Sequence, residues 1–221
     1  LIPDLQKILS RKELRVAMHK DDRPPFFMVL ADGNLGGIDV ELAREIGEFI
    51  GVPVRFIRTA NSFDEVVDQV ADGRADIAIS KLSRTGSRAQ KIIFSTPYFK
   101  MRKAFLLNRI QLEKLGKKKP LHEILNDPQA KIGMVGKSSY ESFTAQTFPN
   151  ATRVPMEDWD SVLVPKVLSG ELTGLYRDEF EVWRSLSDVK DGALYLVSVV
   201  LKDEMDPLSV AVSAEAPGLL S

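Results

Sequence analysis

Small polar and basic side chains cluster directly after an apolar strand in the stretch DIAISKLSRTGSRAQKIIFS, residues 76–95. A hydrophobic core has no need of such side chains, whereas a site that binds a small anion does. Arg88 offers a planar fork of donors that can bind a carboxylate through two parallel hydrogen bonds. Ser80 and Ser83 add hydroxyl donors, and Lys81 adds a positive charge. The alternative is that Arg88 is a surface arginine and that the serines are turn residues.

A second set of candidates follows strands in the second half of the chain. Ser138 and Ser139 stand between an expected strand at 130–136 and a helix. Their hydroxyls can cap this helix, and its first N–H groups can also face an anion. Asp178 follows another apolar strand, where a carboxylate facing Arg88 across a cleft would complement an ammonium group. A solvated loop aspartate is the alternative for Asp178.

Hydrophobic periodicity predicts the elements that position the first set of candidates. Residues 40–50 carry an apolar helical stripe that ends at Gly51, and Asp39 is the expected N-cap. The order of strands and helices predicts a mostly parallel sheet with helices on its faces. Ligands bind such sheets beyond the carboxyl ends of the strands, and residues 80–88 lie at such an end. The predicted strands are 14–18, 52–58 and 76–80, and the predicted helices are 40–50 and 63–72.

A partial internal repeat indicates a second unit built on the same plan. FDEVVDQVADGRADIAIS (63–80) and WDSVLVPKVLSGELTGLYRD (159–178) share an aromatic-Asp pair, an apolar stripe, a glycine and an apolar strand. Pro165 would break a helix interior, so the helix of the second copy is expected to begin near it. Phe63 opens the first copy and is expected either in the core or as a wall of a ligand pocket. The other aromatic residues expected in the core are Trp159, Trp183, Phe26 and Phe27.

Composition narrows the class of protein. The 221 residues suffice for one large α/β domain or two small lobes, and 44% hydrophobic with 28% charged residues is an ordinary globular composition. The net charge of −1 argues against a nucleic-acid partner. Because the chain has no cysteine and its two histidines are far apart in sequence, no metal site or other cofactor is expected. The chain also lacks the G-x-S-x-G, H-E-x-x-H, P-loop and G-x-G-x-x-G motifs of common enzyme classes, so no catalysis is predicted.

Taken in order, the motifs resemble a known family, the bacterial extracellular solute-binding proteins of family 3, of the polar amino-acid type. GNLGGIDVELAREIGEFIGVPVRFI is similar to the family's G-x-D-x-D/E-L-A helix segment. DGRADIAISKLSRTGSRAQKIIFSTPYF resembles its G-x-x-D strand followed by S/T-x-T-x-x-R and F-S-x-P-Y. ELRVAMHKDDRPPFF looks like the family's first strand and Pro-Phe loop, and KIGMVGKSSYESF and LSGELTGLYRDE look like its second-lobe pair.

The resemblance implies an α/β protein with the type II periplasmic-binding-protein fold, in which two α/β lobes joined by two crossing hinge segments close on a ligand. The expected lobes are 1–103 with 206–221, and 104–205. The implied function is capture of a small amino acid between the lobes, at the periplasmic or extracellular face of a bacterial membrane. Its implied partner is a membrane transporter, such as an ABC transporter, or an attached sensor or channel. The family usually continues beyond the last residues of this chain, which predicts either a trimmed chain or a module of a longer membrane protein.

The resemblance also implies a role for each matched residue. Arg88 takes the ligand's α-carboxylate with the help of Ser83, and Asp178 pairs with the α-ammonium group. The remaining matches are Ser80, whose backbone contacts the α-amino group, Ser139, which binds the carboxylate, and Phe63, which forms an apolar wall.

Three positions depart from the family pattern by carrying a positive charge. Arg23 stands about where the family places an aromatic residue, Lys81 where small residues are common, and Arg177 where a neutral residue is frequent. We therefore expect an acidic or polar ligand rather than a cationic one. The alternative function is an enzyme on the same fold, such as a dehydratase of the cyclohexadienyl type. Its general acid or base would be Glu179 or His19.

Overall fold

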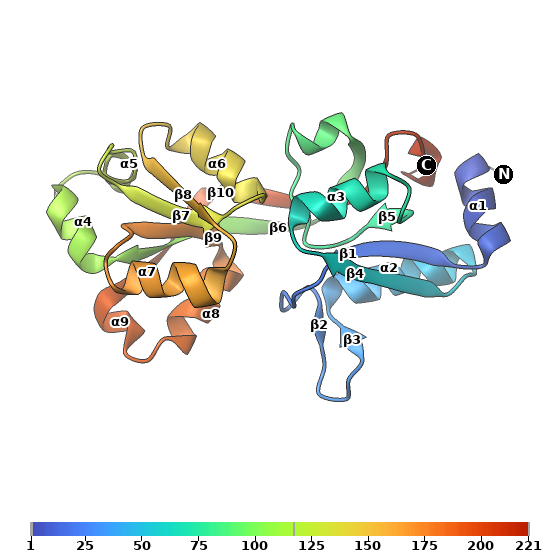
Figure 1. The fold of residues 1–221 in the computed structure, drawn as a ribbon, viewed down its shortest axis with the longest axis horizontal. Coiled ribbons are helices and arrows are strands. Elements are labelled where there is room, and N and C mark those ends of the chain that lie inside the picture. Colours follow the sequence, from blue (N-terminus) through green and yellow to red (C-terminus); the bar gives the residue numbers. More distant parts are fainter. Residues whose placement is uncertain (1, 117, 221) are drawn as a thin grey trace. The chain divides into compact units, whose positions relative to one another are not determined.

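The chain divides into two compact units in a computed structural model that describes residues 2–116 and 118–220 (Figure 1). Unit 1 comprises Leu1–Phe99 with Pro207–Ser221, and unit 2 comprises Lys100–Asp206. Two long strands, β6 (Ile92–Asn108) and β10 (Leu196–Ser213), run from one unit into the other. The chain therefore passes between the units twice.

Unit 1 is a mostly parallel sheet covered by helices. In it β1 pairs in parallel with β4 and β5, and β10 pairs antiparallel with β5, so the strand order is β4-β1-β5-β10. This confirms the parallel arrangement predicted from the alternation of strands and helices. The carboxyl ends of β1 and β5 meet at one edge of the sheet. The elements besides β6 and β10 are α1 (Pro3–Arg11), β1 (Leu14–His19), β2 (Met28–Val29), β3 (Leu35–Gly36), α2 (Ile38–Ile50), β4 (Val54–Ala60), α3 (Phe63–Ala71), β5 (Ile77–Ala78), η1 (Arg88–Gln90) and η3 (Pro217–Leu220).

Helix α2 begins differently from the prediction. Its N-cap position is Gly37, and Asp39 lies inside the first turn, so the expected N-cap at Asp39 is wrong. The first N–H groups of the helix are satisfied by the preceding loop, because Ile38 donates to the Pro25 carbonyl at 3.1 Å and Asp39 donates to the Phe26 carbonyl at 2.9 Å. A tertiary contact thus replaces the side-chain cap and releases the Asp39 carboxylate for another partner.

Gly37 allows this close approach, and we expect Gly37→Ala to destabilise the protein. Its φ of +119° is disfavoured for other residues, and an added Cβ would lie 2.4 Å from the Phe26 carbonyl oxygen. The expected loss is about 2–4 kcal/mol in the free energy of unfolding, measured by urea denaturation. Gly33→Ala is the matched control, because Gly33 also has a positive φ but its added Cβ meets no atom within 4 Å. An equal cost for the two variants would contradict the contact argument.

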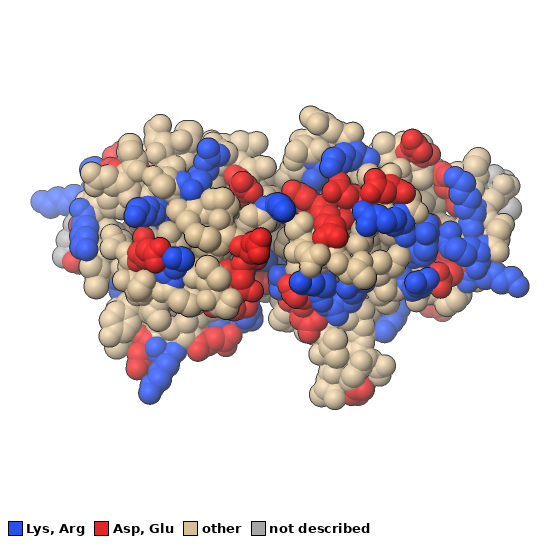
Figure 2. All heavy atoms as spheres, viewed as in Figure 1, with Lys and Arg blue, Asp and Glu red and all other residues tan. Residues whose placement is uncertain are grey.

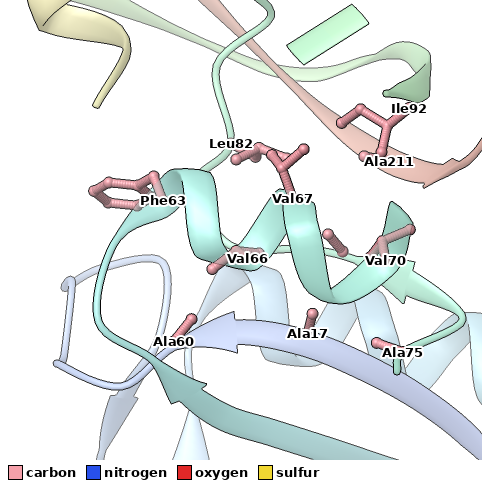
Figure 3. Packing of buried hydrophobic residues seen from close by; sticks show 11 residues of the cluster. Ala17, Ala60, Phe63, Val66, Val67, Val70, Ala75, Leu82, Ile92 and Ala211 are labelled. Carbon is pink, nitrogen blue, oxygen red and sulfur yellow. The ribbon is translucent and has the colours of Figure 1, made fainter. Parts of the chain in front are cut away.

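Helix α3 packs on the sheet through small strand residues (Figure 3). Alanines on the strands leave room for the helix to approach closely, and the Ser62 hydroxyl caps the helix by accepting a 3.1 Å hydrogen bond from the Glu65 N–H. Phe63 lies at the start of the helix beside Ala60, at the same end as the carboxyl ends of the strands. The cluster includes Val66, Val67 and Val70 of α3 and Ala17, Ala78 and Ala211 of the strands.

Unit 2 repeats the plan with the strand order β6-β9-β7-β8, which continues the strand order of unit 1. Strand β9 pairs antiparallel with β6 and parallel with β7, and β7 pairs in parallel with β8. The carboxyl ends of β7 and β9 therefore lie at one edge. Its elements are α4 (Arg109–Gly116), α5 (Leu121–Leu125), β7 (Lys131–Val135), α6 (Ser139–Thr147), β8 (Thr152–Met156), the π-helical turn η2 (Trp159–Leu163), α7 (Val164–Leu168), β9 (Gly174–Asp178), α8 (Glu179–Asp188) and α9 (Gly192–Tyr195).

The two copies of the repeat fold alike, each as a helix followed by a strand. In the second copy the α-helix begins at Val164 with Pro165 in its first turn, as predicted, but a π-helical turn precedes it. Three of the aromatic positions expected in the core are buried: Trp159, Phe26 and Phe27. Trp183 is 47% exposed on α8, so its placement in the core was wrong.

Candidate functional site

Residues 80–88 form a segment that leaves the end of β5 and is tied to neighbouring strands. The Ser80 hydroxyl oxygen accepts a 2.9 Å hydrogen bond from the backbone N–H of His19 at the end of β1. Ser83 forms an isolated antiparallel β-bridge with Leu208 of β10. Because β1 contacts the Ser80 hydroxyl and β10 pairs with the Ser83 backbone, the start of the segment is fixed on both sides.

Arg88 is buried within unit 1, with 4% of its side chain exposed. Its Nε atom donates to Oδ1 of Asp64 at 3.0 Å, and its Nη2 atom lies 2.9 Å from the same oxygen. Its Nη1 atom donates to the Ser83 carbonyl at 3.0 Å. The interpretation of Arg88 as a surface arginine is therefore wrong, and its two partners fix the plane of the guanidinium group.

Asp64 contacts Arg88 and was not among the residues predicted from the sequence. It lies in the first turn of α3, about half exposed, where acidic side chains gather on the surface (Figure 2). A signal was present in the aromatic-Asp pair that opens both copies of the repeat. In the second copy Asp160 also holds an arginine, with 3.1 Å from its Oδ1 to Nη2 of Arg184.

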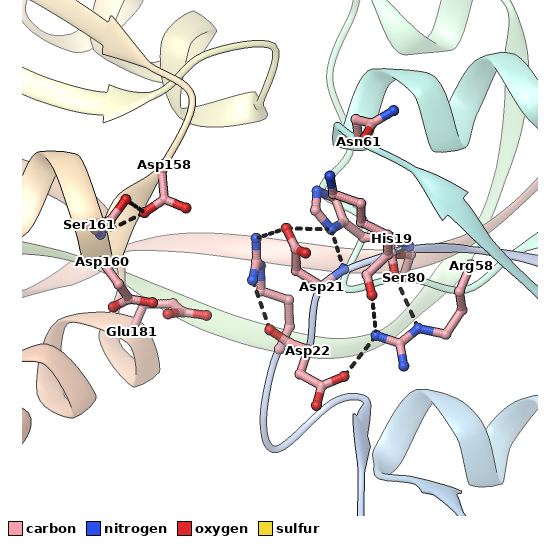
Figure 4. A network of polar contacts seen from close by, with 12 residues as sticks. His19, Asp21, Asp22, Arg58, Asn61, Ser80, Asp158, Asp160, Ser161 and Glu181 are labelled. Atoms are coloured by element: carbon pink, nitrogen blue, oxygen red, sulfur yellow. Dashed lines mark hydrogen bonds and ion pairs between the residues drawn. The ribbon is translucent and has the colours of Figure 1, made fainter.

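His19 ends β1, and polar contacts order the turn that follows it (Figure 4). The buried His19 ring packs against Phe63 with 5.0 Å between ring centroids, and its Nδ1 accepts a 3.1 Å hydrogen bond from the Asp21 N–H. Arg58 donates to the His19 carbonyl at 3.2 Å and to the Asp22 carboxylate at 2.8 Å. Phe63 and His19 thus share one end of the sheet with Ser80. From sequence His19 was a candidate only for a general acid or base, and its contacts with Ser80 and Phe63 come from the tertiary structure.

Arg23 lies half-buried in the same turn. Its Nη1 donates to the Asp22 carbonyl at 2.8 Å, and its Nη2 lies 3.8 Å from the Asp21 carboxylate. The positive charge of Arg23 is therefore placed near the end of β1, beside a carboxylate that is itself more than half exposed.

Lys81 connects the 80–88 segment to helix α2. Its backbone is left-handed, with φ of +50°, and its N–H donates to Oδ2 of Asp39 at 2.5 Å. The Tyr98 hydroxyl donates to the other carboxylate oxygen of Asp39 at 2.8 Å. The Lys81 side chain is buried, with Nζ 5.2 Å from the centroid of the Phe26 ring. Burial raises the pKa of the Asp39 carboxyl to about 7, although the hydrogen bonds from Tyr98 and Lys81 and the Lys81 charge act in the opposite direction.

Asp178 is the last residue of β9 and the N-cap of α8 in unit 2. Only 1% of its side chain is exposed, so it is not a solvated loop aspartate. Its Oδ1 accepts a 3.3 Å hydrogen bond from the Glu181 N–H, and its Oδ2 lies 3.8 Å from Nε of Arg177. The Arg177 guanidinium carbon lies 5.3 Å from the centroid of the Trp159 ring. Strand pairing and capping together hold this carboxylate at the strand end.

Ser138 and Ser139 lie between the end of β7 and the start of α6, and both are buried. Ser138 occupies the N-cap position, but its hydroxyl donates to the Val135 carbonyl at 2.5 Å, so the expected side-chain cap is absent at this residue. Because β7 and β9 are parallel neighbours, both serines lie at the same edge of the sheet as Asp178.

Lys103 is a further residue that the sequence analysis missed. It lies on β6 directly opposite Asp178 in the strand pairing, with Nζ 3.9 Å from the Phe143 ring centroid and 3.6 Å from the Glu204 carboxylate. Lys103 is next to Asp178 only because of the register in which β6 pairs with β9. No local sequence pattern gives this register, so the sequence carries no signal for Lys103.

In each unit the predicted residues gather at the carboxyl ends of parallel strands. Unit 1 holds Ser80, Lys81, Ser83 and Arg88 together with Phe63 and Arg23, and unit 2 holds Ser138, Ser139, Arg177 and Asp178. These groups suit recognition of charged ligand groups by hydrogen bonds and ion pairs. Over residues 2–116 and 118–220, no group of three or more His, Cys, Asp or Glu side chains could hold a metal ion. Within the same described ranges, no helix is long and apolar enough to cross a membrane.

Comparison with known proteins places these features in a wider group. The chain is 22% identical over 165 residues to a putative ABC transporter arginine-binding protein 2 of Escherichia coli (strain K12), which covers 75% of this chain and 63% of that protein. It is 33% identical over 96 residues to the cyclohexadienyl dehydratase of Pseudomonas aeruginosa, which covers 43% of this chain and 35% of the enzyme. The chain thus spans less than two thirds of either curated relative.

A solved structure shows the same fold. The putative binding component of an ABC transporter from Wolinella succinogenes, complexed with lysine, superposes with a TM-score of 0.77 at 25% identity, covering 95% of this chain and 86% of that protein. The fold is therefore the type II periplasmic-binding-protein fold, as the motif order predicted. The model of one family matches residues 14–190. The chain belongs to the bacterial extracellular solute-binding proteins, family 3.

Proposed function

We propose that this protein binds a small amino acid through one charged anchor from each unit, without making or breaking a bond. Arg88 takes the α-carboxylate with Ser83, and Asp178 takes the α-ammonium group. The observation that carries the proposal is the buried Arg88 guanidinium, oriented by Asp64 and the Ser83 carbonyl at the end of a parallel sheet. Charge-assisted hydrogen bonds in such dry surroundings are worth roughly 1.5–3 kcal/mol each.

The remaining predicted residues have supporting roles in this proposal. The Ser80 backbone faces the α-amino group, Ser139 and the N–H groups near Ser138 add donors for the carboxylate, and Phe63 forms an apolar wall. Bound ligand is passed to a membrane transporter or signals through an attached sensor or channel, at the periplasmic or extracellular face of a bacterial membrane. Membership of an extracellular solute-binding family and the similarity to transporter-associated proteins support this part.

The protein is proposed to prefer an amino acid with an acidic or polar side chain. Lys81 and Arg177 are buried cations, Arg177 lies next to Asp178, and Arg23 adds a third positive charge. A cationic ligand would bring further positive charge to them. Because a relative is described as arginine-binding and a similar structure holds lysine, a cationic ligand is the competing outcome.

The test is a thermal-shift screen against the standard amino acids and small dicarboxylates, followed by calorimetry. A ligand at about 100 times its Kd adds about 2.7 kcal/mol to the folded state and raises Tm by several degrees. Tight binding of arginine or lysine with no binding of glutamate would overturn the preference but not the amino-acid site. No shift with any amino acid would overturn the proposed function.

Enzyme activity is the second candidate, because the chain is similar over part of its length to a cyclohexadienyl dehydratase. The candidate acids and bases have structural partners, since Glu179 accepts a 3.0 Å hydrogen bond from the Arg102 N–H and His19 accepts one from Asp21. Incubation with prephenate or arogenate distinguishes the two functions. Product formation would favour the enzyme, and we expect none.

Asp178→Asn separates the two roles of this residue. Asparagine is as good an N-cap as aspartate, so we expect the free energy of unfolding to change by less than about 1 kcal/mol. The charge partner of the ligand ammonium is lost, so we expect at least about tenfold weaker amino-acid binding by calorimetry. Asp178→Ala, which removes both roles, serves as the comparison and should lose stability as well. Unchanged affinity in the asparagine variant would remove Asp178 from the proposed site.

A further inference from the structure

Asp39 is a buried acidic side chain that the proposed function does not use. It lies in the first turn of α2 and is fully enclosed within unit 1. Both oxygens of its carboxylate are engaged, one by the Lys81 N–H at 2.5 Å and the other by the Tyr98 hydroxyl at 2.8 Å. Burying a carboxylate costs free energy even when both of its oxygens accept hydrogen bonds. The placement of Asp39 against the start of the 80–88 segment therefore needs a physical reason.

The backbone of Lys81 supplies this reason. A lysine with φ of +50° is in the left-handed region, which is unfavourable for a residue with a Cβ and persists only where neighbours hold it. The hydrogen bond from its N–H to Asp39 holds this residue against α2. Ser80, immediately before it, is held by His19. Two consecutive anchors therefore set the direction in which the chain leaves β5 and continues to Ser83 and Arg88.

We propose that Asp39 is a positioning residue for the ligand site, which holds the 80–88 segment in its binding conformation, and that uptake of a proton by its carboxyl group weakens this hold. The inference rests on the proposed function. In the ionised form both oxygens accept charge-assisted hydrogen bonds. In the protonated form one oxygen must donate a hydrogen bond, whereas Lys81 N–H and Tyr98 O–H both present donors to it. Protonation therefore weakens one of these two contacts.

Among the residues that the structure describes, the titratable groups that act on Asp39 come from two neighbouring elements. They are the Lys81 ammonium group in the 80–88 segment and the Tyr98 hydroxyl in β6, and both favour the ionised carboxylate. On its own helix, Glu41 is exposed and pairs with Arg44 at 2.6 Å. The pKa of about 7 places the change near neutral pH. His19 contacts Ser80 and is a second titratable side chain near the segment, so the experiment must separate the two groups.

Asp39→Asn makes this separation, because it keeps His19 and nearly the same shape while removing the titration. The readout that needs no ligand is the backbone amide signal of Lys81 in a nitrogen–proton correlation spectrum, followed from about pH 5 to about pH 9. We expect the wild-type signal to titrate with a midpoint near 7 and the Asp39→Asn signal to stay constant. Tyr98→Phe removes one donor to the carboxylate and should move the midpoint to higher pH. Glu45→Gln, an exposed acid on the same helix, is the matched control and should leave the midpoint unchanged.

The second readout is amino-acid affinity by calorimetry over the same pH range. We expect wild-type affinity to fall about fivefold from pH 8 to pH 6, the difference between a charge-assisted and a neutral hydrogen bond, and the affinity of Asp39→Asn to stay flat. Equal pH profiles of the Lys81 amide in wild type and Asp39→Asn would overturn the inference, as would a wild-type pH profile of affinity in that variant. If no amino acid binds, the proposed function fails, while the amide titration still decides whether Asp39 holds Lys81.

Discussion

Arg88→Lys should lose amino-acid binding by about 100-fold although it keeps the positive charge. The guanidinium of Arg88 is held by Asp64 through Nε and Nη2 and by the Ser83 carbonyl through Nη1. A lysine ammonium is a single point that cannot reach both partners and present two parallel donors to a carboxylate at the same time. The loss therefore comes from geometry rather than from charge. Isothermal titration calorimetry with the best ligand of the screen measures it.

The matched control is Arg84→Lys in the same segment. Arg84 is exposed, with its guanidinium carbon 5.8 Å from the Phe94 ring centroid, so this change should leave affinity within about twofold. Both variants should keep the wild-type circular dichroism spectrum, because Asp64 is about half exposed and can be solvated when its partner changes. If Arg88→Lys binds as tightly as wild type, Arg88 is not the carboxylate anchor.

Asp39→Asn should gain stability relative to wild type as the pH rises, by roughly 4 kcal/mol between pH 4 and pH 8. The pKa of the Asp39 carboxyl is raised from 3.8 in the unfolded chain to about 7 in the folded protein, mainly by burial. The folded state therefore binds the proton more tightly, so wild-type stability falls as the pH rises from about 4 to about 7 and is constant above that range. A shift of about three pKa units corresponds to roughly 4 kcal/mol. Asparagine does not ionise and escapes this loss.

The measurement is urea denaturation of both proteins across this pH range. Taking the difference between the two cancels the other titrating groups, which they share, and Glu45→Gln provides a control for removal of an exposed acid from the same helix. A constant difference between Asp39→Asn and wild type across the range would show that Asp39 stays ionised in the folded protein. If the difference in the free energy of unfolding widens as the pH rises, it reports the same protonation of Asp39 that the Lys81 amide signal follows. A widening difference would show that the charge of Asp39 lowers the free energy of unfolding while its carboxylate accepts the hydrogen bond from the Lys81 N–H.

Much of the fold was predictable because its signals are local. Local patterns depend on neighbouring residues alone. They include the apolar stripe of residues 40–50, its end at Gly51 and the alternation of strands with helices. This alternation predicted a parallel sheet, and β1 does pair in parallel with β4 and β5. The repeat predicted a second helix–strand unit, and the helix start at Pro165 followed from the geometry of proline. The start of α2 was predicted wrongly, because loop carbonyls rather than Asp39 satisfy its first N–H groups.

The candidate site was likewise predictable from the sequence only in part. The sequence by itself determined the residue types, their order and their place at strand ends, which is why Arg88, Ser83 and Asp178 could be singled out and the family inferred. Only the tertiary structure decided that Arg88 is buried against Asp64, that Lys103 lies opposite Asp178, and that Asp39 holds the Lys81 N–H. Each of these contacts joins residues far apart in the chain. Their existence depends on strand register and on desolvation, which no local pattern of residues encodes.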